Sequence, residues 1–87
     1  MIHKANPNNY NIPMQGSPVL HQNLQWYVTE DEKVLGVVIR DLIDRDFSWV
    51  VMTQNDQGPG FSAVNMEVSL PTIQAATEAL HKAMKEV

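Results

Sequence analysis

Three carboxylates stand close together near the middle of the chain, at Asp41, Asp44 and Asp46. Oxygen ligands at such short spacing could hold Ca²⁺ or Mg²⁺, which makes these residues the candidate metal ligands of the sequence. A calcium loop of the EF-hand type needs a central glycine and a later glutamate, which this segment does not supply. Aspartate also favours turns, and Arg45 can neutralise a neighbouring carboxylate. We therefore predict a structural turn, with no metal ion or other cofactor bound.

The three histidines are the next side chains that could transfer a proton. None of them has a serine or a carboxylate beside it in a recognisable nucleophile motif. The chain has no cysteine, which excludes disulfides, thiolate metal sites and cysteine nucleophiles. We place His3 in an N-terminal tail, His21 at the surface and His81 on the polar face of a helix. The sequence therefore predicts no catalytic residue, and the protein is not expected to be an enzyme.

Four aromatic residues are the candidate partner-binding side chains: Trp26, Tyr27, Trp49 and Phe61. On a sheet they could stack single-stranded bases or hold a small ligand. The formal net charge of −4 and the scattered lysines and arginines give no surface that would neutralise phosphates. We therefore expect no double-stranded nucleic acid as a partner. Packing in the core or at a protein interface is the favoured role of these aromatics.

The elements that would position these side chains follow from the spacing of apolar residues. Apolar and polar residues alternate as in β-strands, and short turn-forming segments separate the alternating stretches. The four predicted strands begin at residue 23 and cover residues 23–29, 34–39, 47–53 and 61–68. In the last of them Val64, Met66 and Val68 share one face, as expected of an outer strand with one buried side.

A helix is predicted over about residues 72–86. Ser69 or Thr72 can cap its start, and Pro71 suits the entry to a first turn. One stripe at helical spacing would pack on the sheet through Ile73, Ala76, Leu80 and Met84. Antiparallel strands closed by this helix make an α+β domain, a four-stranded β-meander with one C-terminal helix on one face.

The second face of the sheet needs a cover of its own. Residues 34–39 and 47–52 are apolar on both alternating faces, and one helix can shield only one of them. Residues 1–20 are rich in Asn and Pro and predict an extended or partly disordered arm, followed by a single domain at 21–87. We expect the second face to be covered either by a twin subunit or by apolar residues of this arm, which are Tyr10, Ile12, Met14 and Leu20.

Several strings of the chain carry a resemblance, at residues 25–27, 33–37, 44–51 and 68–72. With these strings the chain, over about residues 24–86, resembles small functionally uncharacterised proteins of proteobacteria and their phages. The resemblance implies a strand meander with a helix and a bacterial or phage origin. It implies no active site.

The absence of strong chemical motifs favours a protein that acts by binding. The charged fraction, 18%, is below the usual value of about 25%, and a weakly charged surface associates readily. We see no apolar signal segment and no run of about 18 apolar residues, so we expect a cytoplasmic protein without a membrane partner. The favoured function is a non-catalytic protein-interaction module, as in a bacterial or phage accessory protein. The alternatives are a binder of small ligands or single-stranded nucleic acid through the aromatics, and, less favoured, a metal-dependent enzyme.

Overall fold

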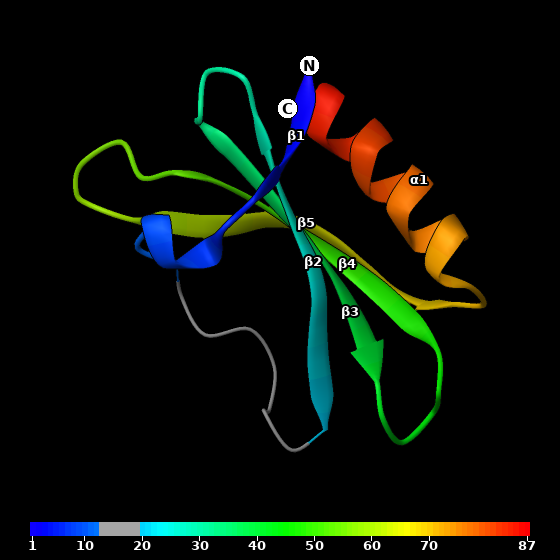
Figure 1. Ribbon diagram of the computed structural model, residues 1–87. Helices are drawn as coiled ribbons and strands as arrows, with labels where there is room; N and C mark the ends of the chain where they lie inside the picture. The colour runs from blue at the N-terminus through cyan, green and yellow to red at the C-terminus, as the bar shows by residue number, and fades with distance from the viewer. Residues whose placement is uncertain (13–19) are drawn as a thin grey trace.

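The computed structural model describes residues 1–12 and 20–87 (Figure 1). Within them the strands form one antiparallel sheet in which every strand lies beside its neighbour in the sequence, and a C-terminal helix packs on it. The α+β class, the antiparallel meander and the helix on the sheet are therefore confirmed. The elements are β1 (Ile2–Ala5), the 3-10 turn η1 (Pro7–Asn9), β2 (His21–Thr29), β3 (Val34–Asp41), β4 (Phe47–Gln54), β5 (Phe61–Leu70) and α1 (Ile73–Lys85).

The expected number of strands, four, is wrong, because the start of the chain adds a fifth strand. β1 pairs antiparallel with β2, from Ile2 opposite Thr29 to Ala5 opposite Trp26. His3 consequently lies in a strand and not in a tail. Four residues are too few to show an alternating pattern of their own, and the backbone edge of β2 supplies the hydrogen bonds that hold them extended.

Helix α1 covers one face of the sheet over β3 and β4. Thr72 caps it, since its Oγ1 accepts a hydrogen bond of 3.1 Å from the Ala75 N–H. A Cβ on Gly36 of β3 would lie 2.6 Å from Leu80 Cδ1, so the missing side chain allows the helix to approach closely. We call the buried residues on this face the helix-side cluster: Val38, Trp49, Val51, Ala76, Leu80, Ala83 and Met84.

The predicted helical stripe is confirmed for Ala76, Leu80 and Met84, which are almost fully buried. It is wrong for Ile73, which is 45% exposed and does not belong to the helix-side cluster. Ile73 is seven residues from Leu80 and therefore points in nearly the same direction from the helix axis. Its exposure follows from its place in the first turn, beyond the packed cluster.

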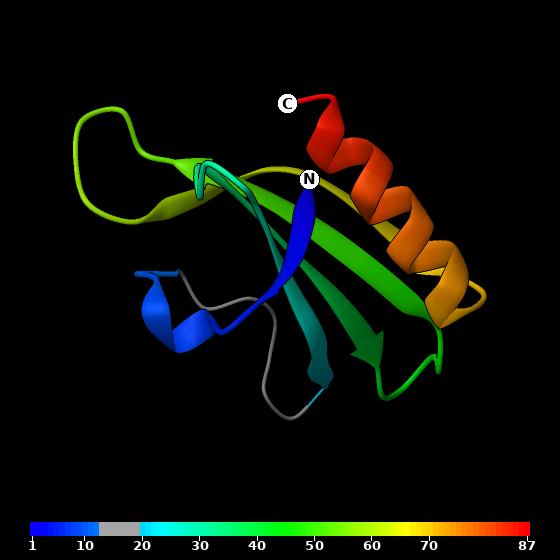
Figure 2. The same cartoon turned by 45° about the horizontal axis from the view of Figure 1, so that its top comes forward.

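The second face is covered by the N-terminal segment, residues 6–12, which follows β1 and places η1 on the opposite side of the sheet from α1 (Figures 1 and 2). Ala5, Tyr10 and Ile12 pack there, as expected for Tyr10 and Ile12. Leu20 is exposed and does not join them, and Met14 lies outside the described residues. The buried residues under this segment form what we call the arm-side cluster: Trp26, Val28, Leu35, Val37, Ile39, Val50, Met52 and Phe61.

Two hydrogen bonds fix this N-terminal segment over the arm-side cluster. Tyr10 donates from its hydroxyl to Glu32 Oε1 at 2.7 Å, and its ring stands edge-on to Phe61 with 5.8 Å between ring centroids. The Phe61 N–H donates to the Asn11 carbonyl oxygen at 3.1 Å. The segment is therefore attached both to the β2–β3 turn and to the start of β5.

Across residues 1–12 and 20–87, no helix is long and apolar enough to cross a membrane.

Candidate interaction surface

Strand β5 is exposed along almost its whole length, although its neighbour β4 is buried. Every residue from Ser62 to Ser69 is exposed, whereas every residue from Trp49 to Met52 is buried. β5 is the last strand of the sheet, and its outer edge meets no other strand in the described part of the chain. Its large apolar side chains stay in contact with water: Val64 is 55%, Met66 57% and Val68 65% exposed.

The sequence predicted one buried side for this strand, and that expectation is wrong. Asn65 lies opposite Val51 on the side of α1, and Met66 lies opposite Val50 on the side of the N-terminal segment. Both are nevertheless exposed, because neither the helix nor the N-terminal segment extends far enough to cover them. The alternating apolar residues were visible in the sequence. Whether they form an exposed surface depends on how far α1 and the N-terminal segment reach over the sheet.

The ladder between β4 and β5 is irregular at two places. From Ala63 to Asn65, β5 advances two residues while β4 advances one, so Val64 is an extra residue. From Glu67 to Leu70, β5 advances three residues while β4 advances two. Such bulges bend an edge strand and leave a residue without a direct partner. A short regular segment centred on Met66 remains between them.

Polar groups near Met66 are only partly engaged. The Met66 N–H donates to the side-chain Oδ1 of Asn65 at 2.9 Å, a local bond of the kind that replaces a ladder partner. Glu67 Oε1 accepts a hydrogen bond of 3.1 Å from the indole N–H of Trp49. A groove of about 290 Å³ separates β5 from α1, and Asn65, Glu67, Ala79 and Lys82 are among the residues that line it. The helix thus stops short of β5.

The structure does not bring the four candidate aromatics together. Trp26 and Phe61 belong to the arm-side cluster, whereas Trp49 belongs to the helix-side cluster and Tyr27 packs against it. Trp26, Trp49 and Phe61 are each less than a tenth exposed. A stacking platform made of all four would need them on one open face.

The β3–β4 turn carries the candidate metal ligands Asp41, Asp44 and Asp46, and hydrogen bonds within the turn hold it together. Asp41 Oδ1 accepts hydrogen bonds from the N–H groups of Ile43 and Asp44, both at 2.9 Å. These two bonds stabilise the carboxylate and lower the pKa of Asp41. Arg45 holds a positive φ of 59° within the same turn. Among residues 1–12 and 20–87, no group of three histidines or carboxylates is arranged to hold a metal ion.

The histidines lie on three different elements. His3 is in β1, and His21 begins β2 with its Nε2 at 3.6 Å from Asp41 Oδ2. His81 was expected to face water, but it is half-buried, edge-on to the Tyr27 ring with 4.6 Å between centroids. Burial, and then the charge of Lys85, lower the pKa of His81. The error arose because the predicted polar face of the helix passes over Tyr27, a residue far away in the sequence.

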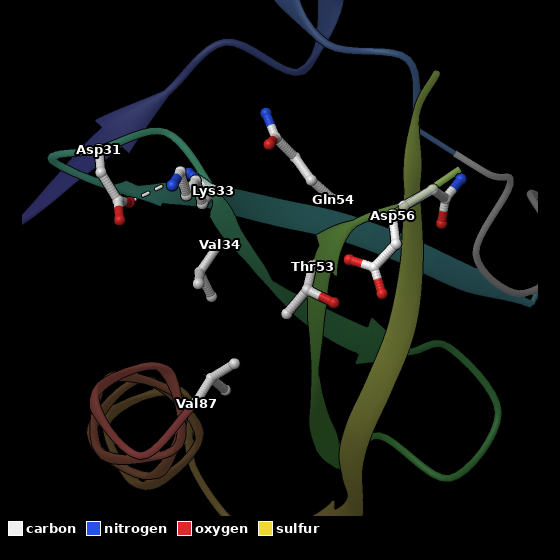
Figure 3. A pocket seen from close by; sticks show the side chains of 8 residues that line it. Asp31, Lys33, Val34, Thr53, Gln54, Asp56 and Val87 are labelled. Carbon is white, nitrogen blue, oxygen red and sulfur yellow. Dashed lines mark hydrogen bonds between the residues drawn. The ribbon is translucent and has the colours of Figure 1, made fainter. Parts of the chain in front are cut away.

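A polar hollow of about 500 Å³ opens at one end of the sheet, beside the C-terminus. Figure 3 shows Asp31 and Lys33 on one side of it, Thr53 and Asp56 across from them, and Val87 near the end of α1. Asp31 Oδ1 accepts hydrogen bonds from the Thr29 hydroxyl, at 2.7 Å, and from the Lys33 N–H, at 3.1 Å, which lower the pKa of Asp31. Its carboxylate therefore serves the β2–β3 turn. This hollow could not be predicted from the sequence, because separate turns and the C-terminal residue form it.

Comparison of the chain with protein-family models, with curated proteins and with solved structures gives no match. A functional interpretation therefore depends on the geometry of the described residues.

Proposed function

We propose that this protein is a non-catalytic protein-interaction module, and that it binds another polypeptide along the outer edge of β5. One observation carries the proposal: an edge strand of ten residues on which Ser62 to Ser69 are all exposed. Exposed large apolar residues gathered on one element of a small protein are typical of a binding site.

The backbone of β5 supports this function as much as its side chains do. An edge strand presents unpaired N–H and C=O groups, to which an incoming strand can add by extending the sheet. Glu67 is the only charged residue of β5, so little repulsion opposes such an approach. The two bulges limit indiscriminate pairing and favour a partner strand of matching shape.

The opposite edge of the sheet is a much poorer binding site. β1 has four residues, and the chain turns away from the sheet directly afterwards at η1. A partner strand added to β1 could therefore form few hydrogen bonds. The contrast between the two edges favours β5 as the surface that a partner would use.

The alternative function is binding of a small ligand or a single-stranded nucleic acid through the aromatic residues. No observation favours it, since three of the four aromatics are buried in two different clusters. A single-stranded nucleic acid or a flat ligand would need exposed ring faces. We therefore propose a protein partner.

Site-specific photo-crosslinking in cells that make the protein tests this function. A photoreactive amino acid at Val68 should form adducts with a polypeptide, whereas the same group at Gln74, exposed on α1, should not. The added change Met66→Lys should suppress the Val68 adducts, because it places a charge in the centre of the surface. Absence of adducts at Val68, or adducts that Met66→Lys leaves unchanged, would contradict the proposed function.

A further inference from the structure

We infer that the polypeptide bound along β5 is a second copy of this chain, paired antiparallel with its two-fold axis at Met66. This inference rests on the proposed function of β5 and adds the identity and the register of the partner. The argument uses the hydrogen bonding of Met66, the positions of the two bulges and the polar residues beside Met66.

The backbone of Met66 is suited to lie on a two-fold axis. Its N–H donates to the Asn65 side chain at 2.9 Å, which indicates that this amide points to the free edge. In an antiparallel strand the N–H and the C=O of one residue point to the same neighbour. Two copies of Met66 facing each other can therefore exchange two N–H to carbonyl hydrogen bonds, and these replace the local bonds to Asn65.

The bulges are placed so that two copies fit each other. The irregularities at Val64 and around Val68 lie on either side of Met66, two residues away in each direction. An axis at Met66 sets Val64 of one copy opposite Val68 of the other. Each bent part of one strand then meets a bent part of its partner, and the ladder between them stays regular. Three exposed apolar residues from each copy are brought together at the centre.

The polar residues select this axis over its neighbours. An axis at Met66 sets Asn65 opposite Glu67 of the second copy, where the amide Nδ2 can donate to a carboxylate oxygen. Glu67 keeps a second oxygen for this bond, because Oε1 accepts from Trp49. An axis at Glu67 would instead place two carboxylates opposite each other, and one at Asn65 would set Val68 opposite the polar Ser62.

Light scattering on the purified full-length protein tests the second copy as partner. We expect the mass to rise with concentration from one chain to two. Met66→Lys should raise the concentration needed for half-association at least tenfold. The matched control is Ile43→Lys, a change at an apolar residue that is 66% exposed in the β3–β4 turn, and it should leave the association unchanged. A protein that stays monomeric at all concentrations, or a dimer equally sensitive to both changes, would overturn the inference.

Single cysteines test the register, since the chain has none of its own. Facing residues of a hydrogen-bonded antiparallel pair have Cα atoms about 5.5 Å apart, within the range of a disulfide. Met66→Cys should therefore form a covalent dimer on mild oxidation. Val64→Cys should not, because the two positions would be displaced by four residues, about 13 Å along the strands. A covalent dimer of Val64→Cys without a covalent dimer of Met66→Cys would overturn the axis at Met66. This test does not depend on whether Met66→Lys folds.

The two proposals fail in different ways. A purified protein that remains monomeric, together with Val68 photo-adducts to another polypeptide, would overturn the second copy and leave the proposed function supported. Absence of both self-association and adducts would overturn both.

Discussion

Strands β4 and β5 pair along most of their length, and both carry Val and Met residues, yet their surroundings are opposite. In β4 the four residues Trp49–Met52 are buried, two in each cluster. In β5 the eight residues Ser62–Ser69 are exposed. The apolar content of a strand therefore does not decide its burial in this protein.

The difference arises from how far the two covers reach. α1 packs over β3 and β4 on one face, and the N-terminal segment packs over the arm-side cluster on the other. Both covers end before the main part of β5. A strand in the middle of the sheet is thus enclosed in one chain, whereas the outer strand has room on both faces and along its edge.

Two methionines offer the most direct test of this contrast. Met52 is fully buried in β4 and Met66 is 57% exposed in β5. Met52→Ala should lower the free energy of unfolding by about 2–5 kcal/mol, because it removes packed methylene groups and leaves a cavity. Met66→Ala should change it by less than about 0.5 kcal/mol. Urea unfolding at a dilution where the protein is a single chain measures both, and equal losses would contradict the described burial.

The close approach of α1 to β3 predicts the next largest effect. In Gly36→Ala the new Cβ would meet Leu80 Cδ1 at 2.6 Å and Met84 Sδ at 2.7 Å. We expect a loss of about 1–3 kcal/mol from overpacking, moderated by movement of these flexible side chains. Gly58→Ala is the matched control, since nothing lies within 4 Å of its Cβ, and it should be nearly neutral. A neutral Gly36→Ala in the same unfolding measurement would show that the helix can move away from the sheet.

A smaller loss of stability is expected when the N-terminal segment, which covers the arm-side cluster, loses one of its hydrogen bonds. Tyr10→Phe removes the 2.7 Å bond from the tyrosine hydroxyl to Glu32, and should cost about 0.5–1 kcal/mol because the bond is exposed. The same bond raises the pKa of Tyr10, since it is made to the protonated hydroxyl. A double-mutant cycle with Glu32→Ala, which removes the acceptor, measures the coupling, and a coupling of zero would mean that this bond does not hold the segment in place.

The smallest expected effect concerns pH and the side of the helix that meets Tyr27. Burial lowers the pKa of His81 in the folded protein, and Lys85 adds to the shift, whereas an unfolded histidine titrates near about 6.5. Between these two values the unfolded chain binds more protons, so stability should fall as the pH decreases from about 6.5 towards the folded value.

This loss should be smaller in His81→Gln, as measured by urea unfolding at several pH values. Asp31 and Asp41 do not interfere, because lowered carboxylate pKa values reduce stability only at more acidic pH, below about 3.9. A pH dependence that His81→Gln leaves unchanged would assign the effect to other groups.

Most of the individual elements could be predicted, because their signals are local. Alternation of apolar residues located β2, β3, β4 and β5, and spacing at helical period located α1. Of the two caps expected, Ser69 or Thr72, the structure uses Thr72. The turn-forming tendency of Asp41 was also visible. β1 could not be predicted in this way, since what keeps four residues extended is the edge of β2.

The candidate surface could be predicted only in part. The sequence showed the shared apolar character of Val64, Met66 and Val68, but it singled out the aromatics as the binding residues. Aromatic side chains are common at interfaces and equally common in cores, and residue type alone cannot separate these two roles. In the structure the aromatics fill both clusters and the aliphatic residues of β5 stay exposed.

The sequence by itself determined which residues form β2 to β5 and α1, and which sides of those elements are apolar. Only the tertiary structure decided which apolar residues α1 and the N-terminal segment bury. Ile73, in the first turn of α1, lies beyond the packed residues and is exposed, and the apolar residues of β5 lie beyond both clusters. The physical reason is that periodicity records the direction of a side chain relative to its own element. Whether that side chain is buried depends on segments far away in the chain, such as Tyr10 over Phe61 or Leu80 over Gly36.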